Sequence, residues 1–290
     1  MARSRTIAER AEALLGAAVV ATAPVAGGDV CTATRLRLSD GRSALMKTHP
    51  YAPEGFFAAE ARGLSWLAAA EAVHLPEVLG VQTDCLVLAW VEPTRPNPEA
   101  AAEFGRALAA MHASGAQCFG GDQEGFIGVL PMPNGTATTW PEFFATRRIL
   151  PYLKLARDRG NIEAEDADAV EGVVRRIVSL AGPDEPPARI HGDLWSGNVV
   201  WSAEHGGVLV DPAAYGGHRE TDLAMLTLFG LPYLSRAVDA YQEVAQESAP
   251  LAEGWQERQP LHQLFPLLVH AASFGGRYGA LAGQAATRMR

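Results

Sequence analysis

Cysteine is scarce in this chain, which has three among 290 residues. They are Cys31, Cys85 and Cys118, an odd number without close spacing. Such a pattern predicts neither a disulfide framework nor a zinc site. We therefore expect the protein to work in a reducing compartment, the cytoplasm.

Positive charge is scarce as well. The chain has 24 Lys and Arg against 33 Asp and Glu, a formal net charge of −9. Nucleic-acid binding needs a basic face, so we expect no nucleic-acid partner. Lys47 and Lys154 are the only lysines, and arginine supplies the other basic side chains. A lysine at a mechanistically meaningful position therefore carries extra weight.

Long apolar runs are also missing. No segment is long and apolar enough to span a bilayer, so we expect no membrane association. The start of the chain resembles a secretion signal, with three arginines before a small apolar run over 13–26. However, Glu9 and Glu12 interrupt the basic part, and apolar residues fall at helical spacing. We expect a short amphipathic helix that runs into a strand.

The composition is that of an ordinary globular protein, with 48% hydrophobic and 20% charged residues. The first ninety residues read as a helix followed mostly by strands, which predicts a small lobe over 1–92 built on an antiparallel sheet. The expected elements are strands 31–38 and 43–48 around a turn at Asp40-Gly41, a helix over 56–70, and strands 78–81 and 86–91.

Three prolines mark a composition shift, and we place a hinge near 89–98. The residues beyond it, 93–290, predict a larger and mainly helical lobe, so the expected fold class is α+β and bilobal. A Gly/Pro-rich stretch at 120–135 predicts a long loop that could close over a site. The helical runs are 99–113, 140–159, 165–180, 222–229, 234–247 and 261–278.

The most informative pattern is Asp193, then Asn198 five positions on, then Asp211 after an apolar run. Phosphoryl transfer from ATP needs this set of side chains, at the spacing of a kinase catalytic loop. Asp193 can accept the proton of an attacking hydroxyl, mainly by orienting it, while Asn198 and Asp211 can bind Mg²⁺. The alternative for Asp193 is a turn residue, which the presence of Asn198 and Asp211 argues against. Together the three predict a kinase that uses ATP and Mg²⁺.

The predicted sheet lobe offers partners for the nucleotide. Gly27 and Gly28 are expected to form a turn between apolar segments, where backbone amides could approach phosphates, although on their own an ordinary turn is the better explanation. Lys47 lies on the return strand, and Glu60 follows on the next helix, where it could pair with Lys47. Each residue alone could be an exposed side chain. Their order favours a nucleotide site.

Three segments carry a resemblance to a known family. The loop HGDLWSGN resembles that of the protein-kinase-like fold, within it the aminoglycoside phosphotransferase and choline kinase group. More narrowly, the chain resembles the fructosamine/ketosamine-3-kinase family from about Gly27 to Tyr278. The segments are HGDLWSGN, DPAAYGGHRETDLAM and RQPLHQLFPLLVHAASFGGRYG, which begin at 191, 211 and 258.

The resemblance implies phosphorylation of the sugar 3-hydroxyl of ketosamines, the adducts of reducing sugars with amines. The product would break down and release the free amine. By this resemblance Asp193 is the base, Asn198 and Asp211 bind magnesium, and Lys47 with Glu60 positions the phosphates. The acceptor is expected to be a ketosamine, either a small molecule or attached to a protein.

Other positions of the resemblance leave alternatives open. Trp195 could stack on the C–H face of a sugar or pack in the core. His218 and Arg219 could touch substrate or support the segment around Asp211, here called the metal loop. We expect Asp222 to hold the catalytic loop (191–198) through backbone amides. Pro212 stands where protein kinases carry Phe, so we expect no activation switch of that kind.

Two further readings compete with ketosamine phosphorylation. The same scaffold could serve an aminoglycoside or choline-type kinase, although the tail lacks an acidic cluster for a polycationic acceptor. It could also be a nucleotide-binding module without catalysis, if one member of the predicted set lies elsewhere.

Cys31 adjoins the glycine turn, where some relatives carry an oxidation-sensitive cysteine. Alternatively, Cys31 is a small buried residue. The oligomeric state does not follow from the sequence.

Overall fold

Alternating side chains form the sheet of the smaller lobe. The structure is a computed structural model that describes residues 6–26 and 30–289. In β2 (Thr32–Leu38), Thr34, Leu36 and Leu38 are buried, while the side chains between them are more exposed. β3 (Ser43–Thr48) returns antiparallel to β2 after the turn at Asp40-Gly41. This turn and both strands confirm the predicted hairpin.

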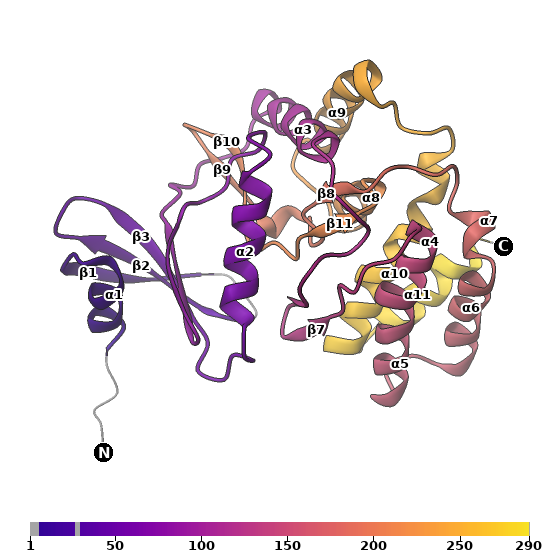
Figure 1. Ribbon diagram of the computed structural model, residues 1–290, viewed down its shortest axis with the longest axis horizontal. Helices are drawn as coiled ribbons and strands as arrows, with labels where there is room; N and C mark the ends of the chain where they lie inside the picture. The colour runs from indigo at the N-terminus through magenta and orange to yellow at the C-terminus, as the bar shows by residue number, and fades with distance from the viewer. Residues whose placement is uncertain (1–5, 27–29, 290) are drawn as a thin grey trace.

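The sheet has five antiparallel strands in the order β1-β2-β3-β5-β4. The other strands are β1 (Val19–Val25), β4 (Val78–Gln82) and β5 (Cys85–Ala89). α1 (Ile7–Leu15) packs beside β1 and β4 and begins at a capping box formed by Thr6 and Glu9. α2 (Phe56–Ala68) lies between the sheet and the second lobe (Figure 1).

The second lobe is larger and mainly helical, as expected for the protein-kinase-like fold (Figure 1). Residues 90–97 connect the lobes without a helix or strand. The exact boundary near residue 92 stays a prediction. The elements of this lobe are α3 (Pro98–Ala113), β6 (Gly125–Ile127), β7 (Leu130–Met132), α4 (Trp140–Phe143), a π-helical segment (Phe144–Ile149), α5 (Leu150–Asp158), α6 (Ala164–Arg175), α7 (Ile177–Leu180), β8 (Ala188–Ile190), a 3-10 turn (Ser196–Asn198), β9 (Val199–Ser202), β10 (Gly206–Leu209), β11 (Tyr215–Gly217), α8 (Glu220–Phe229), α9 (Leu234–Ser248), α10 (Trp255–Phe274) and α11 (Tyr278–Thr287).

Some sequence expectations for this lobe differ from the structure. The stretch 120–135 is not only a loop, because β6 and β7 form a hairpin within it. The helix expected over 261–278 begins earlier, at Trp255, and ends at Phe274. Gly275 and Gly276 then adopt φ values of +66° and +59°, and this left-handed backbone ends the helix before α11.

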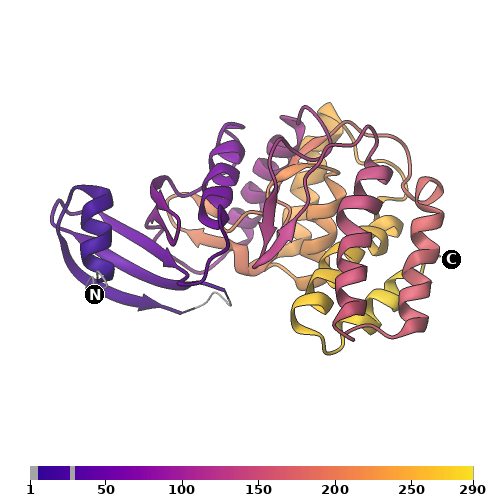
Figure 2. The same ribbon diagram turned by 60° about the horizontal axis from the view of Figure 1, so that its bottom comes forward.

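The core of the helical lobe packs α4, α5, α6, α10 and α11 around large apolar side chains, including Phe143, Phe144, Tyr152 and Phe265. A second cluster joins α3, α8 and α9 to the segment that carries the predicted catalytic loop. Seen from below, β6 and β7 lie between α2 and the helices of the larger lobe (Figure 2). None of the described helices combines the length and the apolar character that crossing a membrane requires.

Candidate active site

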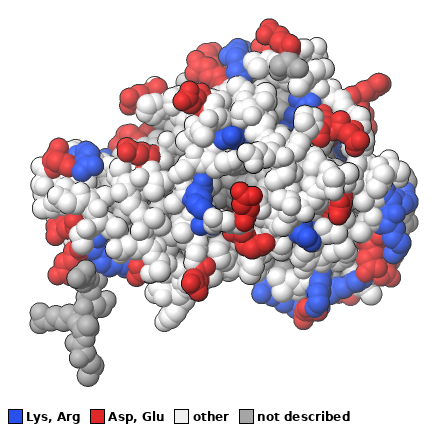
Figure 3. All heavy atoms as spheres, in the orientation of Figure 1, with Lys and Arg blue, Asp and Glu red and all other residues white. Residues whose placement is uncertain are grey.

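A large cleft lies between the two lobes and has a volume of about 1490 Å³. Its walls include β3 and α2 from the sheet lobe, and the segments around Asp193 and Asp211 from the helical lobe. Figure 3 shows a hollow between the lobes on one face, with basic and acidic side chains on opposite sides of it. The cleft therefore collects residues that are far apart in the sequence.

Lys47 is the link between the lobes at this cleft. Its Nζ donates to both carboxylate oxygens of Glu60, at 2.7 and 2.8 Å, and to Oδ1 of Asp211 at 2.8 Å. Burial alone would lower the pKa of Lys47, but the two carboxylates outweigh burial and raise this pKa. Lys47 therefore stays charged in the cleft, and it reaches Asp211 of the other lobe.

The catalytic loop follows β8 and is held by one buried carboxylate. Oδ2 of Asp222 accepts from the backbone N–H of His191 at 2.8 Å, and Oδ1 accepts from that of Gly192 at 2.9 Å. His112 Nε2 lies 3.2 Å from Oδ2, and Asp222 is fully buried. Asp222 thus supports the loop through backbone amides, as the sequence predicted.

His191 ties the catalytic loop to the metal loop. Its Nε2 donates to the carbonyl oxygen of Val210 at 2.9 Å, and its Nδ1 accepts from the N–H of Asp193 at 3.2 Å. Both ring nitrogens are used by a neutral imidazole, and burial lowers the pKa of His191. His191 is therefore a structural support between Asp193 and the residue before Asp211.

Asp193 lies partly buried in the cleft wall, beside Asn198. The Nδ2 of Asn198 donates to the backbone oxygen of Asp193 at 2.8 Å and to its Oδ2 at 3.1 Å. Burial raises the pKa of Asp193 to about 7, against the effect of the Asn198 hydrogen bond. A carboxylate with a pKa near neutrality suits a general base, because such a base works best when its pKa lies near the operating pH.

Asp211 and Asn198 together offer oxygen atoms for a hard cation. The N–H of Val210 donates to the backbone oxygen of Asn198 at 3.0 Å, which keeps the two loops adjacent. Asp211 has a φ of +55°, an uncommon conformation for a residue other than glycine, and both side chains line the cleft. Since the amide nitrogen of Asn198 is used by Asp193, its Oδ1 is the atom left for a metal. This donor set fits Mg²⁺, which prefers oxygen ligands.

An aromatic wall borders the cleft beside the catalytic loop. Trp195 keeps 38% of its surface exposed and contacts Phe229 at a ring distance of 6.4 Å. Phe229 packs on His270 at 4.8 Å, and Phe274 extends the wall with 62% exposure. Trp195 therefore has a face open to the cleft instead of being core. His270 and Phe274 were not anticipated, although they lie four residues apart on a helix that the sequence did predict.

His218 and Arg219 are not among the residues that line the cleft. His218 is buried against Trp140 and His262, at ring distances of 4.9 and 5.0 Å. Arg219 donates to both carboxylate oxygens of Glu185 at 2.7 Å and to the backbone oxygens of Ala249 and Pro250. The structure thus does not bring these two side chains to the candidate acceptor site. They connect segments of the helical lobe.

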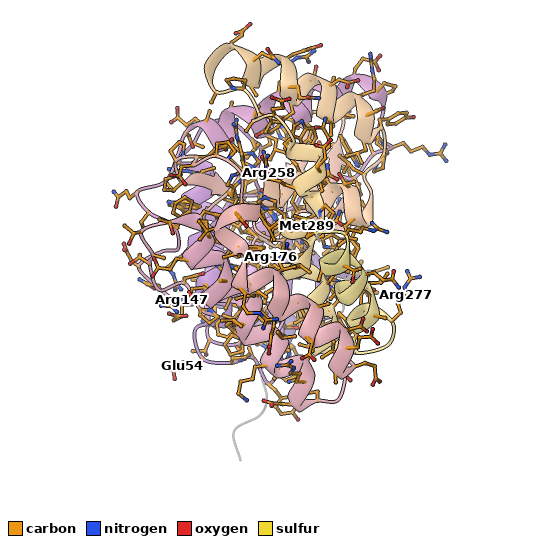
Figure 4. All side chains as sticks on the ribbon, turned by 90° about the vertical axis from the view of Figure 1, so that its right-hand side faces the viewer. Glu54, Arg147, Arg176, Arg258, Arg277 and Met289 are labelled. Atoms are coloured by element: carbon orange, nitrogen blue, oxygen red, sulfur yellow. The ribbon has the colours of Figure 1, made fainter. Side chains whose placement is uncertain are left out.

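A second buried polar cluster lies in the helical lobe, where Figure 4 labels Arg258. The Nε and Nη2 of Arg258 donate to the two carboxylate oxygens of Glu220 at 3.0 and 2.6 Å. His218, Glu220 and His262 are close enough to hold a metal ion, but Arg258 already uses both oxygens of Glu220. Burial alone would raise the pKa of Glu220, but His262 and Arg258 outweigh burial and lower it to about 2. We therefore interpret the cluster as structural.

The glycine turn of the sequence analysis falls outside the described residues, so Gly27 and Gly28 stay a prediction. The neighbouring Val30 and Cys31 line the cleft. Cys31 is partly buried, and burial raises the pKa of its thiol to about 11. The thiol is therefore protonated at neutral pH.

Comparisons with known proteins identify the family of this chain. The profile of the family described as fructosamine kinase matches residues 3–289. A probable ketoamine kinase of Enterococcus faecium is 34% identical over 264 residues, covering 90% of this chain and 92% of its own. A probable ketoamine kinase of Thermus thermophilus is 37% identical over 89% of this chain and 90% of its own.

Solved structures extend the comparison. A crystal structure assigned as a fructosamine-3-kinase of Thermobifida fusca is 49% identical, covers 98% of both chains and has a TM-score of 0.92. An aminoglycoside phosphotransferase in complex with AMP-PNP and hygromycin B is similar in fold alone, at 16% identity, 98% coverage of both chains and a TM-score of 0.67. With a family profile that spans nearly all of its residues, the chain belongs to the fructosamine kinase family, and it is a phosphotransferase.

Proposed function

We propose that this protein transfers the γ-phosphoryl group of ATP to the sugar 3-hydroxyl of a ketosamine and thereby promotes release of the amine. One observation carries the proposal: Lys47 of the sheet lobe contacts Asp211 of the helical lobe at 2.8 Å, in a cleft that Asp193 also lines. Relatives named ketoamine kinases at 34–37% identity support the choice of acceptor.

The residues divide the chemistry between them. The carboxylate of Asp193 orients the acceptor hydroxyl and takes its proton as the new O–P bond forms, and Asn198 keeps this carboxylate in place. Lys47, fixed by Glu60, contributes a positive charge for the phosphates of ATP. Asn198 and Asp211 would hold Mg²⁺, which neutralises phosphate charge when it is bound.

The acceptor lies beside the aromatic wall in this proposal. A flat, partly exposed indole suits the C–H face of a sugar, so Trp195 contributes binding and orientation. Asp122 and Glu124 are exposed carboxylates in the cleft lining, and they suit the ammonium group of a ketosamine. The same carboxylates would suit an aminoglycoside, which keeps that acceptor as the second candidate.

The test is product formation with a panel of acceptors. Purified protein is incubated with ATP, magnesium and one acceptor at a time: free ribulosamines, free fructosamines, ketosamines on the lysines of a protein, or aminoglycosides. Phosphorylated products are detected by mass spectrometry. We expect phosphorylated ketosamine, and we expect Asp193→Asn to lower turnover by about 10²–10⁴-fold, the typical contribution of a positioned base. The exposed Asp239→Asn on α9 serves as the matched control.

Three results would contradict parts of the proposal. Phosphorylation of aminoglycosides alone would assign the second candidate. ATP binding without any phosphorylated product would indicate a nucleotide-binding module. Unchanged turnover in Asp193→Asn would remove Asp193 from the mechanism. The panel also separates free from protein-bound ketosamines as acceptors.

A further inference from the structure

A short hairpin of the helical lobe reaches across to the sheet lobe. β6 and β7 pair antiparallel and are joined by a two-residue turn at Gly128 and Val129, where Gly128 has a φ of +55°. A Cβ placed on Gly128 would lie 4.0 Å from Val30 of the sheet lobe. Figure 2 shows the hairpin between α2 and the larger lobe. The hairpin is thus a contact between the lobes beside the cleft.

Phe126 is the main side chain of this contact. Its ring packs edge-on against Phe56, with ring centroids 5.4 Å apart, and it joins the apolar cluster of Phe57, Leu64 and their neighbours. Arg62 of α2 adds a hydrogen bond of 3.4 Å to the backbone oxygen of Glu124. Phe56 is the first residue of α2, so the hairpin supports the start of this helix.

The hairpin is firmly rooted in the helical lobe. Arg148 is fully buried and donates to the backbone oxygen of Pro133 at 2.5 Å and to Oδ1 of Asn134 at 2.6 Å. Its guanidinium also lies 3.9 Å from the ring centre of Tyr215, on the strand after the metal loop. At the other side of the root, Gly120 and Gly216 exchange two backbone hydrogen bonds. The hairpin therefore has a fixed position in the helical lobe, and it can hold α2 in a fixed position as well.

The helix it contacts carries Glu60. Phe56 and Glu60 are four residues apart, so they lie on the same face of α2. One turn further on, Gly63 packs closely on Pro212, because a Cβ there would lie 3.3 Å from the proline ring. Glu60 is thus placed between two contacts with the helical lobe, Phe126 before it and Pro212 after it.

We propose that Phe126 is a positioning residue for phosphoryl transfer. By packing on Phe56, it holds α2 in the position that lets Glu60 fix Lys47 for ATP. The inference rests on the proposed role of Lys47 with the phosphates. Phe126 thus acts through α2 and not by contacting ATP itself.

The experiment measures ATP affinity in the full-length protein by titration calorimetry, with magnesium and without any acceptor. We expect Phe126→Ala to weaken ATP binding by roughly tenfold and Phe126→Leu by less, because residues coupled through one network change each other's energetics by amounts of this order. Val129→Ala, at the exposed turn of the same hairpin, is the control and should bind ATP as the unaltered protein does.

The decisive arm is a double-mutant cycle with Glu60→Gln. If Phe126 acts through Glu60, replacing Phe126 by Ala in the Glu60→Gln background changes ATP affinity by less than about twofold. Equal effects in both backgrounds would overturn the proposal, since Phe126 would then affect ATP binding without acting through Glu60. Unchanged affinity in Phe126→Ala and Phe126→Leu would overturn it as well. Should Phe126→Ala fail to fold, the cycle is run with Phe126→Leu.

This result is independent of the acceptor. A failure to phosphorylate ketosamines would contradict the proposed function. The double-mutant cycle on ATP affinity could still be interpreted, because it uses no acceptor. Conversely, an uncoupled Phe126 would remove the hairpin from the mechanism without affecting the identity of the acceptor.

Discussion

Replacing Asp222 by Asn tests the support of the catalytic loop. The carboxylate of Asp222 accepts from two consecutive backbone N–H groups, those of His191 and Gly192, and contacts His112. Asparagine keeps the size of the side chain but offers a single acceptor oxygen. Its amide group would face one of the two backbone N–H groups, donor against donor.

The magnitude follows from these bonds. A hydrogen bond to a charged group contributes about 1.5–3 kcal/mol, and one between neutral groups about 0.5–1.5 kcal/mol. In Asp222→Asn, one of the two backbone hydrogen bonds would be made to a neutral oxygen instead of a carboxylate, and the other would be lost. We therefore expect the free energy of unfolding to fall by about 3–4 kcal/mol. Turnover should fall as well, because the loop that presents Asp193 loses its orientation.

Urea unfolding at pH 7 measures the effect. The exposed Asp239→Asn on α9 removes the same charge at the surface and should change the unfolding free energy by no more than about 0.5 kcal/mol. A loss below about 1 kcal/mol in Asp222→Asn would refute the reasoning, because the buried N–H groups would then have found other acceptors.

Three further outcomes are expected. Lys47→Met should lower turnover by about 100-fold or more, because a preorganised positive charge is lost. Turnover is measured with saturating acceptor, and it should fall less in Glu60→Gln. Trp195→Ala should raise the KM for the ketosamine with the KM for ATP unchanged, and equal changes in both would contradict a sugar-stacking role. Folding lowers the pKa of His218 to about 3 and that of Glu220 to about 2, from ordinary values of 6.5 and 4.5. At these two groups the unfolded chain therefore binds more protons, so as the pH falls from 6.5 towards 3 the melting temperature of the unaltered protein should fall relative to that of His218→Asn.

Local patterns predicted the parts of the site that depend on spacing. Asp193 and Asn198 belong to one short loop, so they must lie close together in space. Lys47 and Glu60 follow from a strand and a helix with clear periodicity, and the structure places them 2.7 Å apart. The contact from Lys47 to Asp211 spans 164 positions. The sequence suggested it only because both residues fill roles that a kinase reaction requires.

The direction of a side chain was the part that sequence could not supply. His218 and Arg219 follow the metal loop closely, yet both point away from the cleft to partners at Glu185 and His262. Because these partners belong to other segments of the chain, no local sequence pattern could predict the contacts. The β6–β7 hairpin escaped prediction because its strands have three residues each, too few for alternation to be recognised.

The scarcity of lysine has a chemical consequence for a protein proposed to act on sugar–amine adducts. Reducing sugars condense with neutral amines, and Lys47 is buried between two carboxylates that keep its amine protonated. Lys154 is the other lysine, and it is exposed on α5. Of the two lysine side chains, the one in the cleft is thus shielded from the damage whose products the protein is proposed to process.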